Sequence, residues 1–91
     1  MKLGLLERRG SLRILAYLLT IPEHKAMITK IIRETGIGHY AVSSAVHNLT
    51  KLHLVTEVVS NSFPYTREIK LTEKGLKVAK LLSQIEEVLE R

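Results

Sequence analysis

The chain has 91 residues, no cysteine, 45% hydrophobic residues and a formal net charge of +5. This length suits one small domain, and the absence of cysteine excludes disulfides, thiolate metal sites and cysteine nucleophiles. No apolar run approaches the roughly 18 residues of a membrane-spanning helix, so we expect a cytoplasmic protein without a membrane partner. Basic side chains outnumber acidic ones, and every acid is a glutamate. This excess of positive charge favours a polyanionic partner such as nucleic acid.

The first third of the chain predicts a helix followed by a short strand. Residues 11–19 carry apolar side chains at helical spacing, and Ser11 is the predicted N-cap of this helix. A loop over 20–25 contains one of the two prolines. Residues 25–28 are then predicted to form a short strand.

Residues 29–52 predict two helices joined by a tight turn. Thr29 is expected to cap a helix over 30–35, and Gly36 is expected to end it. A second helix is expected over about 38–52, because its apolar side chains recur at helical spacing, at Ala41, Val42, Ala45, Val46, Leu49 and Leu52. Its opposite side is expected to carry polar and aromatic side chains but no acid, namely His39, Tyr40, Ser43, Ser44, His47, Asn48 and Lys51.

The last third predicts a β-hairpin and a long helix. β-branched residues over 54–60 and alternating residues over 67–71 predict two strands, with a loop around Pro64 between them. Phe63 in this loop is expected to fold back on the sheet or on a partner subunit. Thr72 is expected to cap the final helix.

An apolar stripe on the final helix predicts a homodimer. Its members follow one another in steps of four, three and four, which is the spacing of a coiled-coil seam, at Val78, Leu82, Ile85 and Leu89. One small domain offers limited cover for this stripe, so we expect the same helix of a second copy to cover it, aided by Leu3, Leu5 and Leu6. The competing interpretation is that the stripe covers only the core of its own chain.

The order of these elements is typical of a winged helix-turn-helix domain, an α+β fold that is mainly helical and has a two- or three-stranded wing. Three stretches also carry a family resemblance. "GSLRILAYLL" resembles the first helix of ArsR-type regulators, and "ITKIIRETGIGHYAVSSAVHNLTKLHLV" is similar to the helix-turn-helix of the ArsR and MarR groups. "IKLTEKGLKVAKLL" resembles the second wing strand and the following helix of MarR-like proteins.

The resemblance implies a DNA-binding transcriptional regulator that works as a homodimer. Within a single domain over 1–91, it places the recognition helix at about 38–52, the wing at about 54–71 and the dimerisation helix at about 72–90. Gly38 stands where such motifs usually have a capping Ser or Thr. His53 stands where a glycine often ends the recognition helix.

The candidate DNA-binding residues divide by the part of the duplex that each suits. Side chains that can hydrogen-bond base edges in the major groove are His39, Tyr40, Ser43, Ser44, His47 and Asn48, of which the Asn48 amide suits adenine. Cations that can hold phosphates beside this helix are Lys30, Arg33 and Lys51. Gly38, at the start of the helix, is a further candidate DNA-binding residue. In the wing, Arg67 can enter the minor groove or hold a phosphate, with hydrogen bonds from Asn61, Ser62 and Tyr65. The competing interpretation of the helix is an ordinary solvated face.

Other functions find little support in the sequence. His39 and His47 share a helix face without a neighbouring carboxylate or thiol, so no metal and no other cofactor is expected. No nucleophile stands with a base and an orienting acid, so no enzyme is expected. The function predicted first is sequence-specific binding of double-stranded DNA by a repressor. The alternatives are an architectural, chromatin-type protein of low specificity and a protein-interaction winged helix that does not bind DNA. The sequence identifies neither an operator nor an effector ligand.

Overall fold

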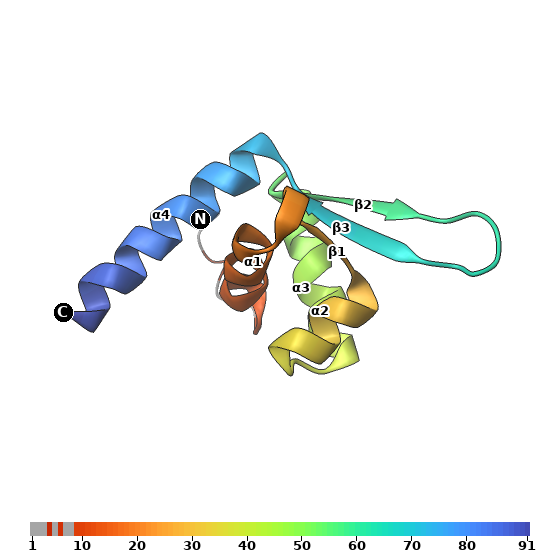
Figure 1. Cartoon of the computed structure of the whole chain (residues 1–91), viewed down its shortest axis with the longest axis horizontal. Coiled ribbons are helices and arrows are strands. Elements are labelled where there is room, and N and C mark those ends of the chain that lie inside the picture. Colours follow the sequence, from red (N-terminus) through yellow and green to blue (C-terminus); the bar gives the residue numbers. More distant parts are fainter. Residues whose placement is uncertain (1–3, 5, 7–8) are drawn as a thin grey trace.

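The computed structural model describes residues 4, 6 and 9–91, and its helices and strands follow the predicted order (Figure 1). They are α1 (Ser11–Thr20), the single 3-10 turn η2 (Pro22–His24), β1 (Lys25–Met27), α2 (Ile28–Thr35), α3 (His39–Lys51), β2 (Val55–Val59), β3 (Arg67–Leu71) and α4 (Glu73–Glu90). The predicted α+β, mainly helical class is confirmed. Leu3 and Leu5, which were expected to support a dimer, lie outside the described residues. Among the described residues, no helix combines the length and the hydropathy needed to cross a membrane.

The three strands form one antiparallel sheet in the order β1–β3–β2. β3 lies in the middle, where Ile69 pairs with Ala26 on one side and with Glu57 on the other. The buried side chains of β3 face the helices, because successive strand residues point to opposite sides. Beyond this core, the β2–β3 hairpin continues away from the helices as a long wing (Figure 1).

Helix α1 forms the centre of the core. Its Ile14, Leu15 and Leu18 are fully buried, and it packs against α2, α3, α4 and β3. Burial of each such side chain contributes about 1.5–3 kcal/mol. α1 therefore supports both the helix-turn-helix and the C-terminal helix.

Two predicted helix caps are wrong. Gly10, at φ 87°, occupies the N-cap position of α1, and Ser11 is instead buried in the first turn, where its hydroxyl has no hydrogen-bond partner. A side chain at Gly10 would come within 2.9 Å of the Ile37 side chain, so the start of this helix packs closely against Ile37. α2 begins before Thr29, with Met27 at its N-cap position and no side-chain cap.

The residues that follow α3 are hydrogen-bonded to the start of α4. His53 adopts φ 61°, so it occupies the left-handed conformation in which a glycine was expected. The Thr72 hydroxyl donates to the His53 carbonyl at 2.7 Å and accepts from the Gly75 N–H at 2.9 Å, which confirms Thr72 as the cap of α4. The Thr72 N–H also donates to the Leu54 carbonyl at 3.0 Å.

The apolar stripe of α4 is divided between the core and the solvent. Val78 and Leu82 are half-buried and pack against the core, whereas 54% of Ile85 and 78% of Leu89 are exposed. The C-terminal part of α4 extends away from the other elements, on the side of the molecule opposite to the wing (Figure 1). The described chain thus covers the first half of the predicted seam and leaves the second half open.

Candidate nucleic-acid interface

The exposed face of α3 carries no acidic side chain. The recognition helix predicted at about 38–52 spans His39–Lys51 in the structure, and its apolar stripe is buried through Val42, Ala45, Val46 and Leu49. The exposed side chains on the other face are His39, Tyr40, His47, Thr50 and Lys51, with Ser43 and Ser44 half-buried beside them. This face presents hydrogen-bonding groups and a cation to the solvent.

Asn48 does not belong to this face, which corrects its assignment as a base-reading residue. Only 5% of the residue is exposed, and its side-chain amide donates to the Ser44 carbonyl at 3.0 Å. At about 100° per residue, Asn48 lies at the margin between the polar face and the apolar stripe. Tertiary packing buries the Asn48 side chain at this position.

The turn before α3 leaves the start of the helix open. Gly36 ends α2 at φ 71°, and its N–H donates to the Ile32 carbonyl at 3.0 Å, so its predicted role is confirmed. Gly38 is the N-cap of α3 at φ −62°, and no side chain caps the first turn. The backbone N–H groups there are consequently available to an anion, which the helix dipole also favours.

The three cations predicted to contact phosphates flank this region. Lys30 and Arg33 are exposed on α2, and Lys51 is exposed in the last turn of α3. Arg33 lies 3.8 Å from the carboxylate of Glu34, but both side chains are exposed and the pair is weak. All three cations are therefore accessible to solvent.

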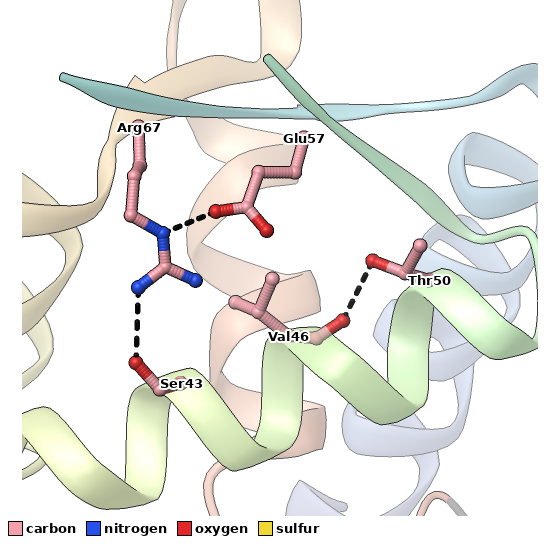
Figure 2. A network of polar contacts seen from close by, with 5 residues as sticks. All are labelled: Ser43, Val46, Thr50, Glu57 and Arg67. Carbon is pink, nitrogen blue, oxygen red and sulfur yellow. Dashed lines mark hydrogen bonds and ion pairs between the residues drawn. The ribbon is translucent and has the colours of Figure 1, made fainter. Parts of the chain in front are cut away.

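Arg67 connects the wing to α3 (Figure 2). Its Nε donates to the Glu57 carboxylate on the neighbouring strand, and its Nη1 donates to the Ser43 hydroxyl at 3.2 Å. Arg67 pairs with Val59, the last pair of the β2–β3 ladder before the loop 60–66. Its predicted role, entering the minor groove or holding a phosphate, stays a prediction, and the side chain is half-buried with two partners in the chain. Figure 2 also shows Thr50, whose hydroxyl donates to the Val46 carbonyl at 2.8 Å.

Glu57 is a site residue that the sequence interpretation missed. Strand alternation could have indicated this residue, because Glu57 and Val59 share one face of β2 and Val59 pairs with Arg67. The pair neutralises the Glu57 carboxylate on the strand that neighbours Arg67. The recognition helix itself has no acid, as expected, and this acid on β2 is paired.

The wing tip is uncharged and aromatic. Between the strands, the loop 60–66 reads SNSFPYT, and 86% of Phe63 and 74% of Tyr65 are exposed. The prediction that Phe63 folds back on the sheet is wrong for the single chain. Asn61 and Ser62 are exposed as well, so the structure places them and Tyr65 together at the tip.

Within the described residues, no three His, Cys, Asp or Glu side chains gather as metal ligands. His39 and His47 are both exposed on α3. Among the residues that the structure describes, two groups have a raised pKa, and both lie outside this face. Burial and, to a smaller extent, the Glu34 carboxylate raise the pKa of Tyr17, and a hydrogen bond to Glu23 raises the pKa of Lys25.

Among comparisons with known proteins, only those with solved structures support this architecture. No family model matches the sequence, and no curated protein sequence matches it. Among solved structures, the chain is similar to a transcriptional regulator homologue from Pyrococcus horikoshii OT3, with a TM-score of 0.79 and 23% identity over 96% of this chain and 86% of the other. It is similar to a protein from Archaeoglobus fulgidus, with a TM-score of 0.77 and 22% identity over 100% and 99% of the two chains.

A third similar structure is a MarR-family regulator, described as putative in its own name, from Enterococcus faecalis V583. The TM-score is 0.80 at 20% identity, over 98% of this chain and 79% of the other. Identities this low show the fold. The chain is a winged helix-turn-helix protein that resembles MarR-type regulators in architecture.

Proposed function

We propose that the chain binds double-stranded DNA as a homodimeric transcriptional regulator, with α3 in the major groove and the β2–β3 hairpin beside it. The observation that carries this proposal is the acid-free exposed face of α3, to which Arg67 joins the wing through Ser43. A carboxylate on this face would repel phosphate, and the Glu57 carboxylate on β2 is paired with Arg67. No catalytic role and no cofactor is proposed.

Phosphate contacts supply the affinity in this proposal. Lys30, Arg33 and Lys51 are exposed around the uncapped start and the end of α3. Each phosphate that they neutralise releases counterions, so binding should weaken as salt rises. With Asn48 buried, the groups that remain to read bases are His39, Tyr40, His47 and the two serines, Ser43 and Ser44.

A second copy is the proposed cover for the open half of the α4 stripe. Ile85 and Leu89 line an apolar groove of about 400 Å³ between α1 and α4, together with Leu12, Ala16 and Leu82. A symmetric pair of chains would bury this groove and would place two recognition helices on two half-sites, about 34 Å apart. The compartment proposed is the cytoplasm, and repression by occupying a promoter is the proposed mode of action.

Selection from a pool of random duplexes, followed by a salt titration on the enriched duplex, tests DNA binding. We expect an enriched inverted repeat and an affinity that falls steeply with salt. Lys51→Ala should reduce the salt slope by about one unit. Lys70→Ala is the matched control, because Lys70 is exposed on the outer face of β3, away from α3. Absence of binding at low salt would refute the proposal and would favour a winged helix that contacts proteins.

Light scattering tests the dimer separately. Ile85→Glu with Leu89→Glu should give a monomer and should weaken DNA binding, since one half-site alone would then be held. Lys80→Gln also makes the net charge less positive, at an exposed position of α4, and should leave the oligomeric state unchanged. A double variant that stays dimeric would exclude this part of the stripe as the interface.

The burial of Asn48 favours a second candidate function, an architectural DNA-binding protein of low specificity. Without this amide, the described α3 face has no side-chain amide and no arginine, which are the usual readers of adenine and guanine. In that case the selection would enrich no sequence, while the steep salt dependence would remain.

A further inference from the structure

The described aromatic residues lie mostly on the surface of this chain. Tyr40 on α3 is 87% exposed, Phe63 is 86% exposed and Tyr65 is 74% exposed, whereas Tyr17 alone is half-buried. Large aromatic side chains normally contribute to a core, and exposed ones gather at binding surfaces. All three exposed aromatic residues belong to the recognition helix or the wing tip.

The two aromatic rings of the wing tip form an ordered pair. The rings of Phe63 and Tyr65 meet edge to face, with centroids 6.4 Å apart and planes 86° apart. The loop that holds them is closed by hydrogen bonds from the Ser60 N–H to the Thr66 carbonyl at 2.9 Å and from the Ser60 hydroxyl to the Ser62 carbonyl at 2.9 Å. Phe63 is thus presented to the solvent by a closed loop.

The wing tip is unsuited to clamping a phosphate, because residues 60–66 include no cation. Its exposed groups are instead a phenyl ring, a proline, a phenol and short polar side chains. Apolar side chains of this kind act on DNA by entering between base pairs from the minor groove, which unstacks one step and kinks the duplex. The flat faces of bases are the part of DNA that suits an uncharged aromatic ring.

The position of the wing tip agrees with insertion into the minor groove. The Arg67–Ser43 hydrogen bond holds the last strand pair before the wing tip beside the exposed face of α3. From Arg67, three residues of loop lead to the tip, and they span at most about 10 Å. With α3 in the major groove, this distance carries the tip past the phosphate backbone toward the adjacent minor groove, which is only about 6 Å wide.

We propose that Phe63 is an apolar wedge, braced by Tyr65, which inserts at a base step of the minor groove and bends the bound DNA. The inference rests on the proposed DNA binding and adds a deformation of the duplex to it. Pyrimidine–purine steps such as TA unstack most easily, so the wing should prefer them at a position where it makes no hydrogen bond to a base. Tyr65 can direct its hydroxyl to the sugar–phosphate backbone while its ring supports Phe63.

Two fluorescence measurements on one duplex test the wedge. The duplex is the one enriched by selection or, without enrichment, one of mixed sequence at low salt. 2-Aminopurine at successive steps of the minor groove reports unstacking, and energy transfer between dyes at the two ends reports bending. The wild-type chain should brighten one step and shorten the end-to-end distance.

The variants separate the wedge from general effects on the wing. Phe63→Ala should abolish the brightening and the bend and should weaken binding about tenfold. Phe63→Leu should retain part of the bend, because leucine also serves as a wedge. Val58→Ala is the matched control, since Val58 is an exposed apolar residue of the same hairpin, on its outer face.

Each outcome decides between the possibilities. A Phe63→Ala chain that bends and brightens the duplex as the wild type does would overturn the wedge and leave the proposed function intact. A Phe63→Ala chain with a changed oligomeric state and unchanged DNA bending would overturn it in favour of contact with a second copy. Failure of the wild-type chain to bind any duplex at low salt would overturn both proposals together.

Discussion

A Cβ atom on Gly75 would lie 1.8 Å from the carbonyl oxygen of Leu54. The first turn of α4 therefore touches the backbone that leaves α3, and only a glycine permits this approach. Gly75→Ala should lower the free energy of unfolding by about 3 kcal/mol or more, although alanine favours helices by about 1 kcal/mol over glycine. Urea denaturation measures this loss. Lys77→Ala, on the exposed side of the same helix, should change stability by less than about 0.5 kcal/mol.

The two glycines of the turn before α3 should respond in opposite ways to the same substitution. Gly36 has φ 71°, so Gly36→Ser should cost about 1 kcal/mol. Gly38 has φ −62° and open space for a side chain, and Gly38→Ser would add a capping hydroxyl at an N-cap that lacks one. We expect it to stabilise the chain by about 0.5 kcal/mol. Thermal unfolding of both variants checks the difference, and equal shifts would contradict the turn geometry.

The effect of Ser11→Ala on the free energy of unfolding distinguishes the observed buried position of Ser11 from its predicted role as an N-cap. As an N-cap, Ser11→Ala would cost about 1 kcal/mol. As a buried residue whose hydroxyl has no hydrogen-bond partner, it should lose nothing or gain up to about 1 kcal/mol. Thr72→Ala is the control, because Thr72 is bonded to both His53 and Gly75 and should cost about 1–2 kcal/mol. A clear loss for Ser11→Ala in chemical denaturation would refute the observed start of α1.

Glu57→Gln should strengthen binding to nonspecific DNA while slightly destabilising the chain. The substitution removes the carboxylate that neutralises Arg67, so one more positive charge is available to phosphate. The salt slope should become steeper by about one unit. The cost in stability should be about 1 kcal/mol or less, because both side chains are partly exposed. Unchanged DNA affinity and salt slope would show that Arg67 does not face the duplex.

The stability of the chain should also fall in alkaline solution through Tyr17. Burial raises the pKa of its hydroxyl above the ordinary value of 10.0, and the Glu34 carboxylate adds to this effect. The folded state then holds the proton more tightly than the unfolded state. This contribution is fully present below pH 10.0 and is lost as the pH rises through the folded-state pKa. Tyr17→Phe should remove this part of the alkaline loss, as urea denaturation at a series of pH values would show.

Local patterns were sufficient to predict most elements of this fold. α3 was expected over about 38–52 and spans His39–Lys51, and β3 was predicted at its observed bounds over 67–71. These elements depend on residue spacing and on turn residues, which act over a few positions. Thr72 was correctly predicted as a cap for the same reason.

The predictions that failed depend on contacts between residues distant in sequence. Asn48 lies at the margin of the α3 stripe, where helical spacing alone does not decide between solvent and core. Gly10, which packs closely against the distant Ile37, takes the N-cap position predicted for Ser11. The pairing of Arg67 with Glu57 required the register of two strands, and Phe63 is exposed because the wing extends beyond the helices. The roles of the DNA-facing and dimer residues remain predictions.

The single hydroxyl of Thr72 joins the last turn after α3 to the first turn of α4. With Gly75 pressed against Leu54 at the same point, little freedom remains for the two helices to rotate about each other. In a pair of chains joined through α4, the rotational phase between the two recognition helices would then be set by this joint. Such a pair would tolerate changes of base sequence between its half-sites but not the insertion of a single base pair, which would turn one half-site by about a tenth of a helical revolution.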